Sequence, residues 1–227
     1  MAIERAGEQQ YFYVPGALDL VPDQAYLMDT IKPAHFLCGE TQCLLCPKKA
    51  DGDNKVYLTL EHIVPSFACK TYPESLGPIR DLDENHITLC RGCHDLADNG
   101  VRDKPGKKRV QGKMKTFQKE GVVGLIYYIR DYPRTPHTHY RDRQSRQWSE
   151  LFGTLETQLP IEIDVCQEEL LELRDRSFGI VPAEQYTMEV SRLQAKIREF
   201  DRSCEIVDRS LNVWRRGDFF RSPQVLD

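Results

Sequence analysis

The sequence has no long apolar run, and its first ten residues have no apolar core. No stretch of its 227 residues approaches the ~18 consecutive apolar residues that a membrane-spanning helix needs. Residues 1–10 are acidic and polar without an apolar core, which argues against a secretory signal. Internal repeats and low-complexity tracts are also lacking. With 40% hydrophobic and 29% charged residues, the composition predicts a soluble, globular, cytoplasmic protein that does not bind membranes.

The chain as a whole also lacks an excess of positive charge. Its formal net charge is −4, which taken alone argues against a nucleic-acid-binding protein. The charge is unevenly distributed, however. Residues 1–101 hold 8 Lys and Arg against 15 Asp and Glu, residues 102–146 hold 13 against 4, and residues 147–227 hold 10 against 16. The strongly basic middle segment indicates either a solvated linker or a surface that binds phosphates.

Cysteine, by contrast, is well represented, with eight residues in the chain. Four of them form two pairs, Cys43-x-x-Cys46 and Cys90-x-x-Cys93. Because two intervening residues let one tight turn present both sulfurs to an ion, these pairs predict a four-cysteine structural zinc site. One alternative is that the pairs are redox motifs or unrelated turns. Another is that Cys38 replaces one of the four ligands.

A second group of side chains between and beside the cysteine pairs is suited to hydrolysis. Neutral His62 has an ordinary pKa that allows it to activate water near neutral pH. The Glu61 carboxylate is a good ligand for a hard metal ion, while His94 and Asp98, four residues apart, share one helix face. Asn85 can orient the His62 ring through a hydrogen bond. Together these residues predict a site that hydrolyses phosphodiesters.

The segment from Cys43 to Asn99 resembles an HNH endonuclease domain of the zinc-framed type. The resemblance implies a ββα-metal fold, in which a catalytic ion is held between a β-hairpin and a helix. The residues that carry it are Cys43-x-x-Cys46, Glu61-His62-Ile63-x-Pro65, Asn85-x-x-x-Leu89-Cys90 and Cys93-His94.

The same resemblance implies a role for each matching residue. The expected catalytic set is His62 as the general base, Asn85 as the residue that holds the geometry, and Glu61 and His94 at the ion. Glu61 occupies a position that is usually Asp, and Asp98 lies where many members have a second helix-borne His or Asn. A carboxylate at Asp98 favours Mg²⁺ or Mn²⁺ over zinc as the catalytic ion, with Glu61, His94 and Asp98 as its ligands.

Local patterns around these motifs predict secondary structure. Strand-forming residues fill 56–60 and 86–89, and a short helix is expected at 94–99. Apolar spacing predicts a further helix at 117–132, despite its glycines. Closer to the N-terminus, 23–31 is a short helix candidate.

Apolar residues in the last third of the chain recur in steps of three and four, at 163–173 and again at 190–214. The two segments form either an antiparallel hairpin or a coiled coil with another chain, and the short connector favours the hairpin. The predicted fold class is therefore α+β, with a small ββα-metal core and its four-cysteine zinc embedded in a mainly α-helical chain.

We expect four parts along the chain. They are an N-terminal packing segment at 1–36, an HNH nuclease core at 37–101, a basic nucleic-acid-binding segment at 102–150, and a helical hairpin or coiled-coil interaction region at 151–227. Lysines and arginines that follow the nuclease core are expected to contact phosphates. They are Arg102, Lys104, Lys107, Lys108, Arg109, Lys113 and Lys115.

The function expected from these features is that of a metal-dependent HNH endonuclease, with DNA as the substrate and RNA as an alternative. Two other functions stay open. One is a zinc-framed module that binds nucleic acid without cutting it. The other is a nuclease subunit, of the phage-defence or restriction type, that is active only in a larger complex. In that case the C-terminal helices would bind a partner protein or a second copy of the chain.

Overall fold

The computed structural model describes side chains in five stretches of the chain. These are residues 43–46, 58–100, 112–132, 144–175 and 182–217, together with Phe219. The backbone alone is also described at 3–6, 9–12, 27–28, 138–143 and 176. Cys38 and the basic residues from Arg102 to Arg109 lie outside the described residues.

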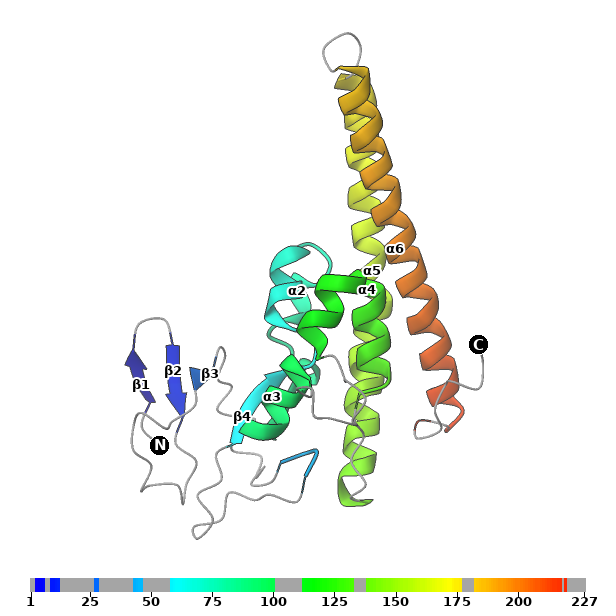
Figure 1. Cartoon of the computed structure of the whole chain (residues 1–227). Coiled ribbons are helices and arrows are strands. Elements are labelled where there is room, and N and C mark those ends of the chain that lie inside the picture. The colour runs from blue at the N-terminus through cyan, green and yellow to red at the C-terminus, as the bar shows by residue number, and fades with distance from the viewer. Residues whose placement is uncertain are drawn as a thin grey trace, which may run out of the picture. The chain divides into compact units, whose positions relative to one another are not determined.

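The described elements are mainly helices, with small antiparallel sheets (Figure 1). This agrees with the α+β class expected from the sequence. In chain order they are β1 Ile3–Ala6, β2 Gln9–Phe12, β3 Leu27–Met28, β4 Leu58–His62, α2 Ser66–Thr71, η2 Gly77–Ile79, η3 Asp83–Asn85, β5 His86–Cys90, α3 Arg91–Asn99, α4 Lys113–Arg130, α5 Thr138–Arg176 and α6 Ala183–Arg215. None of the helices in this described part combines the length and apolar character that a membrane span requires.

Several boundaries differ from those expected. Strand β4 extends to His62, so Glu61 and its neighbour both belong to the strand. Helix α3 starts at Arg91 rather than at His94, directly after β5. The helix candidate at 23–31 is wrong where the structure describes it, because Leu27–Met28 form β3 and pair with β2. Helix α5 runs without a break from Thr138 to Arg176.

The first of two compact units is formed by residues 1–63, 81–115 and 133–147. It contains a three-stranded sheet in the order β1-β2-β3 and a two-stranded sheet of β4 and β5. In the second sheet the strands are antiparallel, with Leu58 opposite Cys90 and His62 opposite His86. Every residue of both strands is buried. Helix α3 follows β5 without a loop and contacts both strands, which makes a compact strand–strand–helix arrangement.

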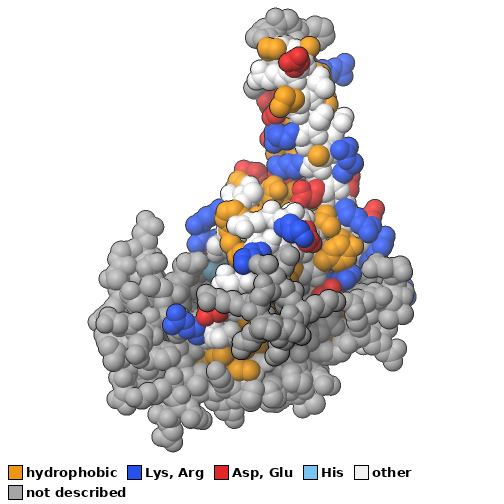
Figure 2. Space-filling view, viewed as in Figure 1, with side chains coloured by type: hydrophobic (Ala, Val, Ile, Leu, Met, Phe, Trp, Pro, Cys, Tyr) orange, Lys and Arg blue, Asp and Glu red, His pale blue; other side chains and the backbone are white. Residues whose placement is uncertain are grey.

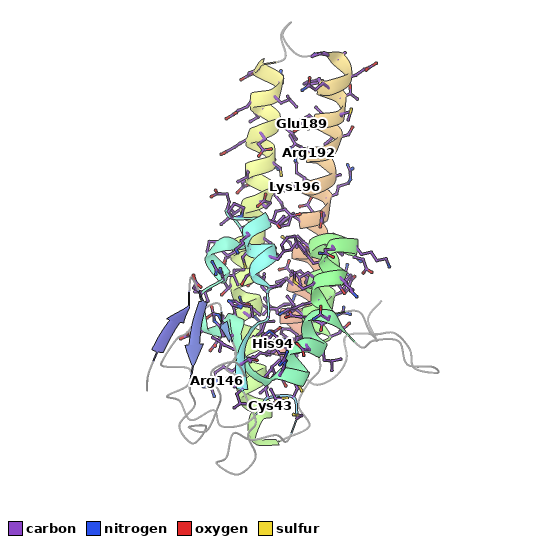
Figure 3. All side chains as sticks on the ribbon, turned by 60° about the vertical axis from the view of Figure 1, so that its left-hand side comes forward. Cys43, His94, Arg146, Glu189, Arg192 and Lys196 are labelled. Atoms are coloured by element: carbon purple, nitrogen blue, oxygen red, sulfur yellow. The ribbon has the colours of Figure 1, made fainter. Side chains whose placement is uncertain are left out.

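The second unit is formed by residues 64–80, 116–132 and 148–227. Helices α5 and α6 lie side by side in it (Figures 1 and 3). Glu156 pairs with Arg215 near one end of this helix pair, and Glu169 pairs with Arg192 nearer the other. A residue farther along α5 thus pairs with a residue earlier in α6. The two helices of the chain are therefore antiparallel.

The helix pair buries large apolar side chains at the end where α6 finishes. Phe152 of α5 packs edge to face against Trp214 of α6, with ring centroids 4.6 Å apart. Farther along α6, Phe200 is fully buried and stacks edge to face on Tyr72. The outer surface of the pair is different, because Figure 2 shows Lys and Arg interspersed with Asp and Glu there. Burial of the apolar seam therefore stabilises the pair, while charges of both signs share its exposed side with apolar residues such as Leu171 and Met188.

Helix α4 contains a kink that depends on one glycine. Gly121 has φ 64° and ψ −152°, outside helical geometry. The next residue, Val122, donates its backbone N–H to the Glu199 carboxylate at 2.5 Å. A side chain at Gly121 would place its Cβ 2.0 Å from the same carboxylate oxygen. The kink thus exposes a helical N–H that Glu199 of α6 caps, and the site requires a residue without Cβ.

Candidate metal centres

Four cysteines from two separate parts of the first unit converge on one point. Cys43 and Cys46 come from a loop, whereas Cys90 ends β5 and Cys93 lies in the first turn of α3. One sulfur from each residue lies within 4.8 Å of all the others, so the group could hold a metal ion. The loop is fixed to the sheet because the Leu44 N–H donates to the Thr88 carbonyl at 3.0 Å. The two Cys-x-x-Cys motifs therefore form one group, as their spacing predicts.

The thiols of this group perturb one another. Burial raises the pKa of Cys43 to about 11. Burial also raises the pKa of Cys93, and the negative charge that Cys43 and Cys90 would carry raises it further. Burial would raise the pKa of Cys90 too, yet hydrogen bonds from the Cys93 backbone and from the neighbouring thiols lower it below its ordinary value. Without an ion, Cys43 and Cys93 hold protons that a bound cation would displace.

A second group, which we call the acidic site, consists of Glu61, His94 and Asp98. Glu61 belongs to β4, and the other two lie one turn apart on α3. His94 Nε2 is 2.5 Å from Glu61 Oε2 and 3.3 Å from Asp98 Oδ2. The three ligand atoms lie within 4.8 Å of one another, so this group could also hold a metal ion.

The His94 ring is held from both sides. Its Nδ1 lies 2.7 Å from the Thr59 hydroxyl, which in turn donates to the Leu89 carbonyl at 3.0 Å. Thr59 and Glu61 are two residues apart in β4, so both side chains point to the face that α3 covers. Residues of one strand thus orient both ring nitrogens, which fixes the direction in which the imidazole faces the carboxylates.

Interactions within the acidic site favour the charged forms of His94 and Asp98. Burial would lower the pKa of His94, but hydrogen bonds with Asp98 and Glu61 and the charges of both carboxylates raise it to about 9. Burial would raise the pKa of Asp98, but the hydrogen bond with His94 and the positive charge of Lys113 lower it. In the absence of an ion, an imidazolium and an ammonium balance the two carboxylates.

Lys113, the first residue of α4, is part of this balance. It was predicted among the exposed phosphate contacts, yet its side chain is buried. Its ammonium donates to a Glu61 carboxylate oxygen and to the His62 carbonyl, and lies 3.2 Å from Asp98 Oδ1. Lys115, also predicted as a phosphate contact, is exposed.

His62 and Asn85 lie next to the acidic site but outside the three-residue group. His62 is opposite His86 in the sheet, with ring centroids 4.5 Å apart. As the neighbour of Glu61 in a strand, it directs its side chain to the other face of the hairpin. Asn85 is fully buried, and its backbone carbonyl accepts the Ile63 N–H at 2.8 Å. The structure thus brings together the three predicted ion ligands. The predicted base, His62, faces the other side of the hairpin, and Asn85 lies directly before β5.

His86 was not assigned a role from the sequence, and the structure gives it a packing environment. The residue is buried, and its Nδ1 lies 2.7 Å from the Leu82 carbonyl. The side-chain amide of Gln147 donates to the His86 carbonyl and, at 3.2 Å, to the Glu84 carbonyl. These contacts tie the start of β5 to α5 within the first unit.

Sequence reasoning missed two residues that contact the acidic site. Thr59 is one of several β-branched strand residues, and nothing in its local pattern marks it as a His94 partner. Lys113 lies far along the chain from Glu61, within a basic stretch in which charge alone suggested phosphate contacts. The glycine before it was the one local signal that the chain approaches another segment closely at this point.

Comparison with known proteins identifies no relative of this chain. No family model, curated protein or solved structure matches this chain.

Proposed function

We propose that the protein is a metal-dependent endonuclease of the HNH type that hydrolyses phosphodiester bonds in DNA. The observation that carries this proposal is the acidic site. Glu61, His94 and Asp98 come from a strand and from the helix after its partner strand, and their ligand atoms lie within 4.8 Å of one another. Two carboxylates and one imidazole are a ligand set that suits a divalent ion in a hydrolytic site.

The four-cysteine group is proposed to hold a structural zinc. Cys46 Sγ and Cys90 Sγ are 3.7 Å apart. Sulfurs bound tetrahedrally to one zinc at ~2.3 Å lie roughly 3.8 Å from each other, so this spacing fits the ion. The site closes the loop at Cys43 onto the end of β5 and the start of α3. Zinc would therefore stabilise the strand–strand–helix arrangement that positions the acidic site.

The acidic site is proposed to bind Mg²⁺ or Mn²⁺. Oxygen ligands from Glu61 and Asp98 favour hard ions over zinc, which prefers the sulfurs nearby. An ion bound there would neutralise charge on the phosphate and polarise the attacking or leaving oxygen. The chain's contribution is to hold both carboxylates and the imidazole together, which β4 and α3 do through the contacts of His94 with Glu61 and Asp98.

His62 is proposed to accept the proton from the attacking water. It follows Glu61 directly as the last residue of β4, and 8% of its surface is exposed. Asn85 would hold the backbone at that edge through the Ile63 contact. The basic segment that includes Lys115, together with Arg102, Lys104, Lys107, Lys108 and Arg109, would hold the nucleic-acid backbone.

Cleavage assays test this proposal directly. Purified protein is incubated with supercoiled plasmid, linear duplex, single-stranded DNA and RNA, each with Mg²⁺, Mn²⁺ or EDTA. We expect Mg²⁺- or Mn²⁺-dependent nicking of plasmid, and its loss in His62→Ala and Glu61→Gln. Activity that persists in EDTA, or a His62→Ala variant that cuts as well as the parent, overturns the endonuclease proposal. A preference for RNA would replace DNA as the substrate.

A second candidate function is a zinc-framed module that binds nucleic acid without cutting it. The observation in its favour is the Lys113 ammonium, which already balances the carboxylates of Glu61 and Asp98. Salt-dependent DNA binding with no cleavage of any substrate would support this alternative. If cleavage appears only after a partner protein is added, the nuclease would instead be the subunit of a larger phage-defence or restriction-type complex.

A further inference from the structure

Lys113 occupies a position that a metal ion would need. Its ammonium contacts a Glu61 oxygen and the His62 carbonyl, and a second carboxylate oxygen, Asp98 Oδ1, is 3.2 Å away. The Lys113 side chain is 2% exposed and that of Glu61 is 1% exposed. This ammonium therefore has no water shell of its own and depends on the same oxygens that a cation would bind.

The backbone is shaped to bring this lysine in. Gly112 immediately precedes it and approaches the end of α3. A Cβ built on Gly112 would lie 2.2 Å from the Asp98 carbonyl oxygen and 2.5 Å from the Asn99 nitrogen. Only a residue without a side chain can approach that closely, so α4 begins directly against the last turn of α3. The backbone itself therefore places Lys113 beside the acidic site, and the conformation of its long side chain is not the only cause.

The two carboxylates are divided between two nitrogens. Each carboxylate has one oxygen near His94, at 2.5 Å for Glu61 and 3.3 Å for Asp98. The other oxygen of each carboxylate is close to the Lys113 ammonium. Two negative charges are therefore matched by two positive ones, and all four carboxylate oxygens are engaged.

We propose that Lys113 is a resident cation that competes with the divalent ion for Glu61 and Asp98, and so sets the ion affinity of the acidic site. This inference rests on the metal site proposed above. If the ion binds while the ammonium stays, three positive charges face two carboxylates. If the ammonium leaves, the ion takes over its oxygens, and ordering of the α4 start is lost. Either way Lys113 opposes ion binding.

A purely structural role for Lys113 makes the opposite prediction. If the lysine only holds the Glu61 carboxylate in place, its removal would loosen a ligand and weaken ion binding. The sign of the change in affinity therefore separates competition from positioning. That sign is independent of whether the site hydrolyses anything.

The test is a titration of the full chain, with its zinc in place, with Mn²⁺. Binding is monitored by the electron paramagnetic resonance signal of free Mn²⁺ and by calorimetry. The competing ammonium is removed in Lys113→Met. Lys113→Gln keeps N–H donors for Glu61 and serves if the apolar variant does not fold. Lys115→Met, which removes an exposed charge two residues along α4, is the matched control. Glu61→Gln removes a ligand and shows which binding belongs to the acidic site.

We expect Lys113→Met or Lys113→Gln to tighten Mn²⁺ binding about tenfold or more, since one buried like charge is removed. Lys115→Met should change it far less. Equal or weaker binding in both Lys113 variants, with binding still abolished by Glu61→Gln, overturns the competition but leaves the metal site intact. Absence of any Glu61-dependent Mn²⁺ binding, in the parent and in both variants, overturns the competition and the proposed metal site together.

Discussion

His94 Nε2 lies 2.5 Å from Glu61 Oε2, and this contact joins helix α3 to strand β4 at the centre of the acidic site. The two residues meet because β5 pairs with β4 and leads into α3 without a loop. Thr59, on the same face of β4, lies 2.7 Å from the other ring nitrogen. Since β4 engages both nitrogens, the imidazole is oriented before any ion or substrate arrives.

The raised pKa of His94 predicts how stability depends on pH when no divalent ion is bound. Hydrogen bonds with Asp98 and Glu61 outweigh burial and raise the pKa from 6.5 to about 9. The folded state thus holds this proton more tightly than the unfolded state. The resulting stabilisation is complete below about pH 6.5 and is lost as pH rises through about 9, at most about 3 kcal/mol in all. Urea titrations across this range measure the decline.

His94→Gln is the control for this pH dependence. Glutamine keeps a hydrogen-bonding side chain near Glu61 but does not titrate. We expect the variant to be less stable than the parent below about pH 6.5 and to show a flatter profile between there and about pH 9. An unchanged slope in the variant would assign the pH dependence to other groups, such as the thiols of the four-cysteine group.

Removal of one cysteine ligand should release the structural ion. Cys90 is 3% exposed and is the N-terminal cap residue of α3. We expect Cys90→Ser to lose zinc, measured by elemental analysis, and to lose several kcal/mol of stability, because metal binding and local folding are coupled. Cys204→Ser is the matched control, since that half-buried thiol of α6 lies outside the group. Full zinc content in Cys90→Ser would contradict the zinc proposal.

The local part of the acidic site could be predicted from the sequence. His94 and Asp98 are four residues apart, and that spacing places both on one face of any helix. Two short strands before the helix were also expected, and the resemblance to HNH domains implied that Glu61 lies at the same ion. The cysteine pairs were expected to meet for a similar reason, because each pair needs only one turn and the strands bring the two turns together.

The remaining part of the site could not be predicted, because it depends on contacts between distant segments. Lys113 is close to Glu61 only because the chain returns to α3 at Gly112, and no periodicity encodes that return. The same holds for β3, where two residues pair with β2 inside a stretch whose local pattern suggested a helix. Local propensity is overridden in both cases by pairing or packing that a single sequence does not show.

Gly121 should not tolerate a side chain. Its φ of 64° lies in the left-handed region, and a Cβ would be 2.0 Å from a Glu199 oxygen. Gly121→Ala would strain the backbone and displace the carboxylate that caps Val122. We expect a loss of about 2–4 kcal/mol, measured by thermal or urea unfolding. Gly153→Ala is the control, since nothing lies within 4 Å of its Cβ position in helix α5. That change should be neutral or stabilise by up to about 1 kcal/mol.

A buried polar cluster in the second unit supplies the last prediction. Glu162 of α5 is 3% exposed, accepts a hydrogen bond from Ser75 at 2.8 Å, and pairs with Lys196 of α6. Lys196→Met would leave the carboxylate buried with its charge unmatched, which typically costs about 3–5 kcal/mol. Glu162→Leu combined with Lys196→Met removes both charges, and we expect it to recover most of that loss.

With the single variant Glu162→Leu added, these proteins form a double-mutant cycle, measured by urea unfolding. A large coupling energy would show that the pair fixes α6 against α5 by mutual neutralisation. Additive effects would instead mean that Ser75 and solvent satisfy Glu162 without the lysine. Lys196 also lies 5.2 Å from the centre of the Tyr72 ring, so part of its contribution is a contact with that aromatic face. Lys196→Arg keeps the charge and the ring contact, and it should therefore stay within about 1 kcal/mol of the parent.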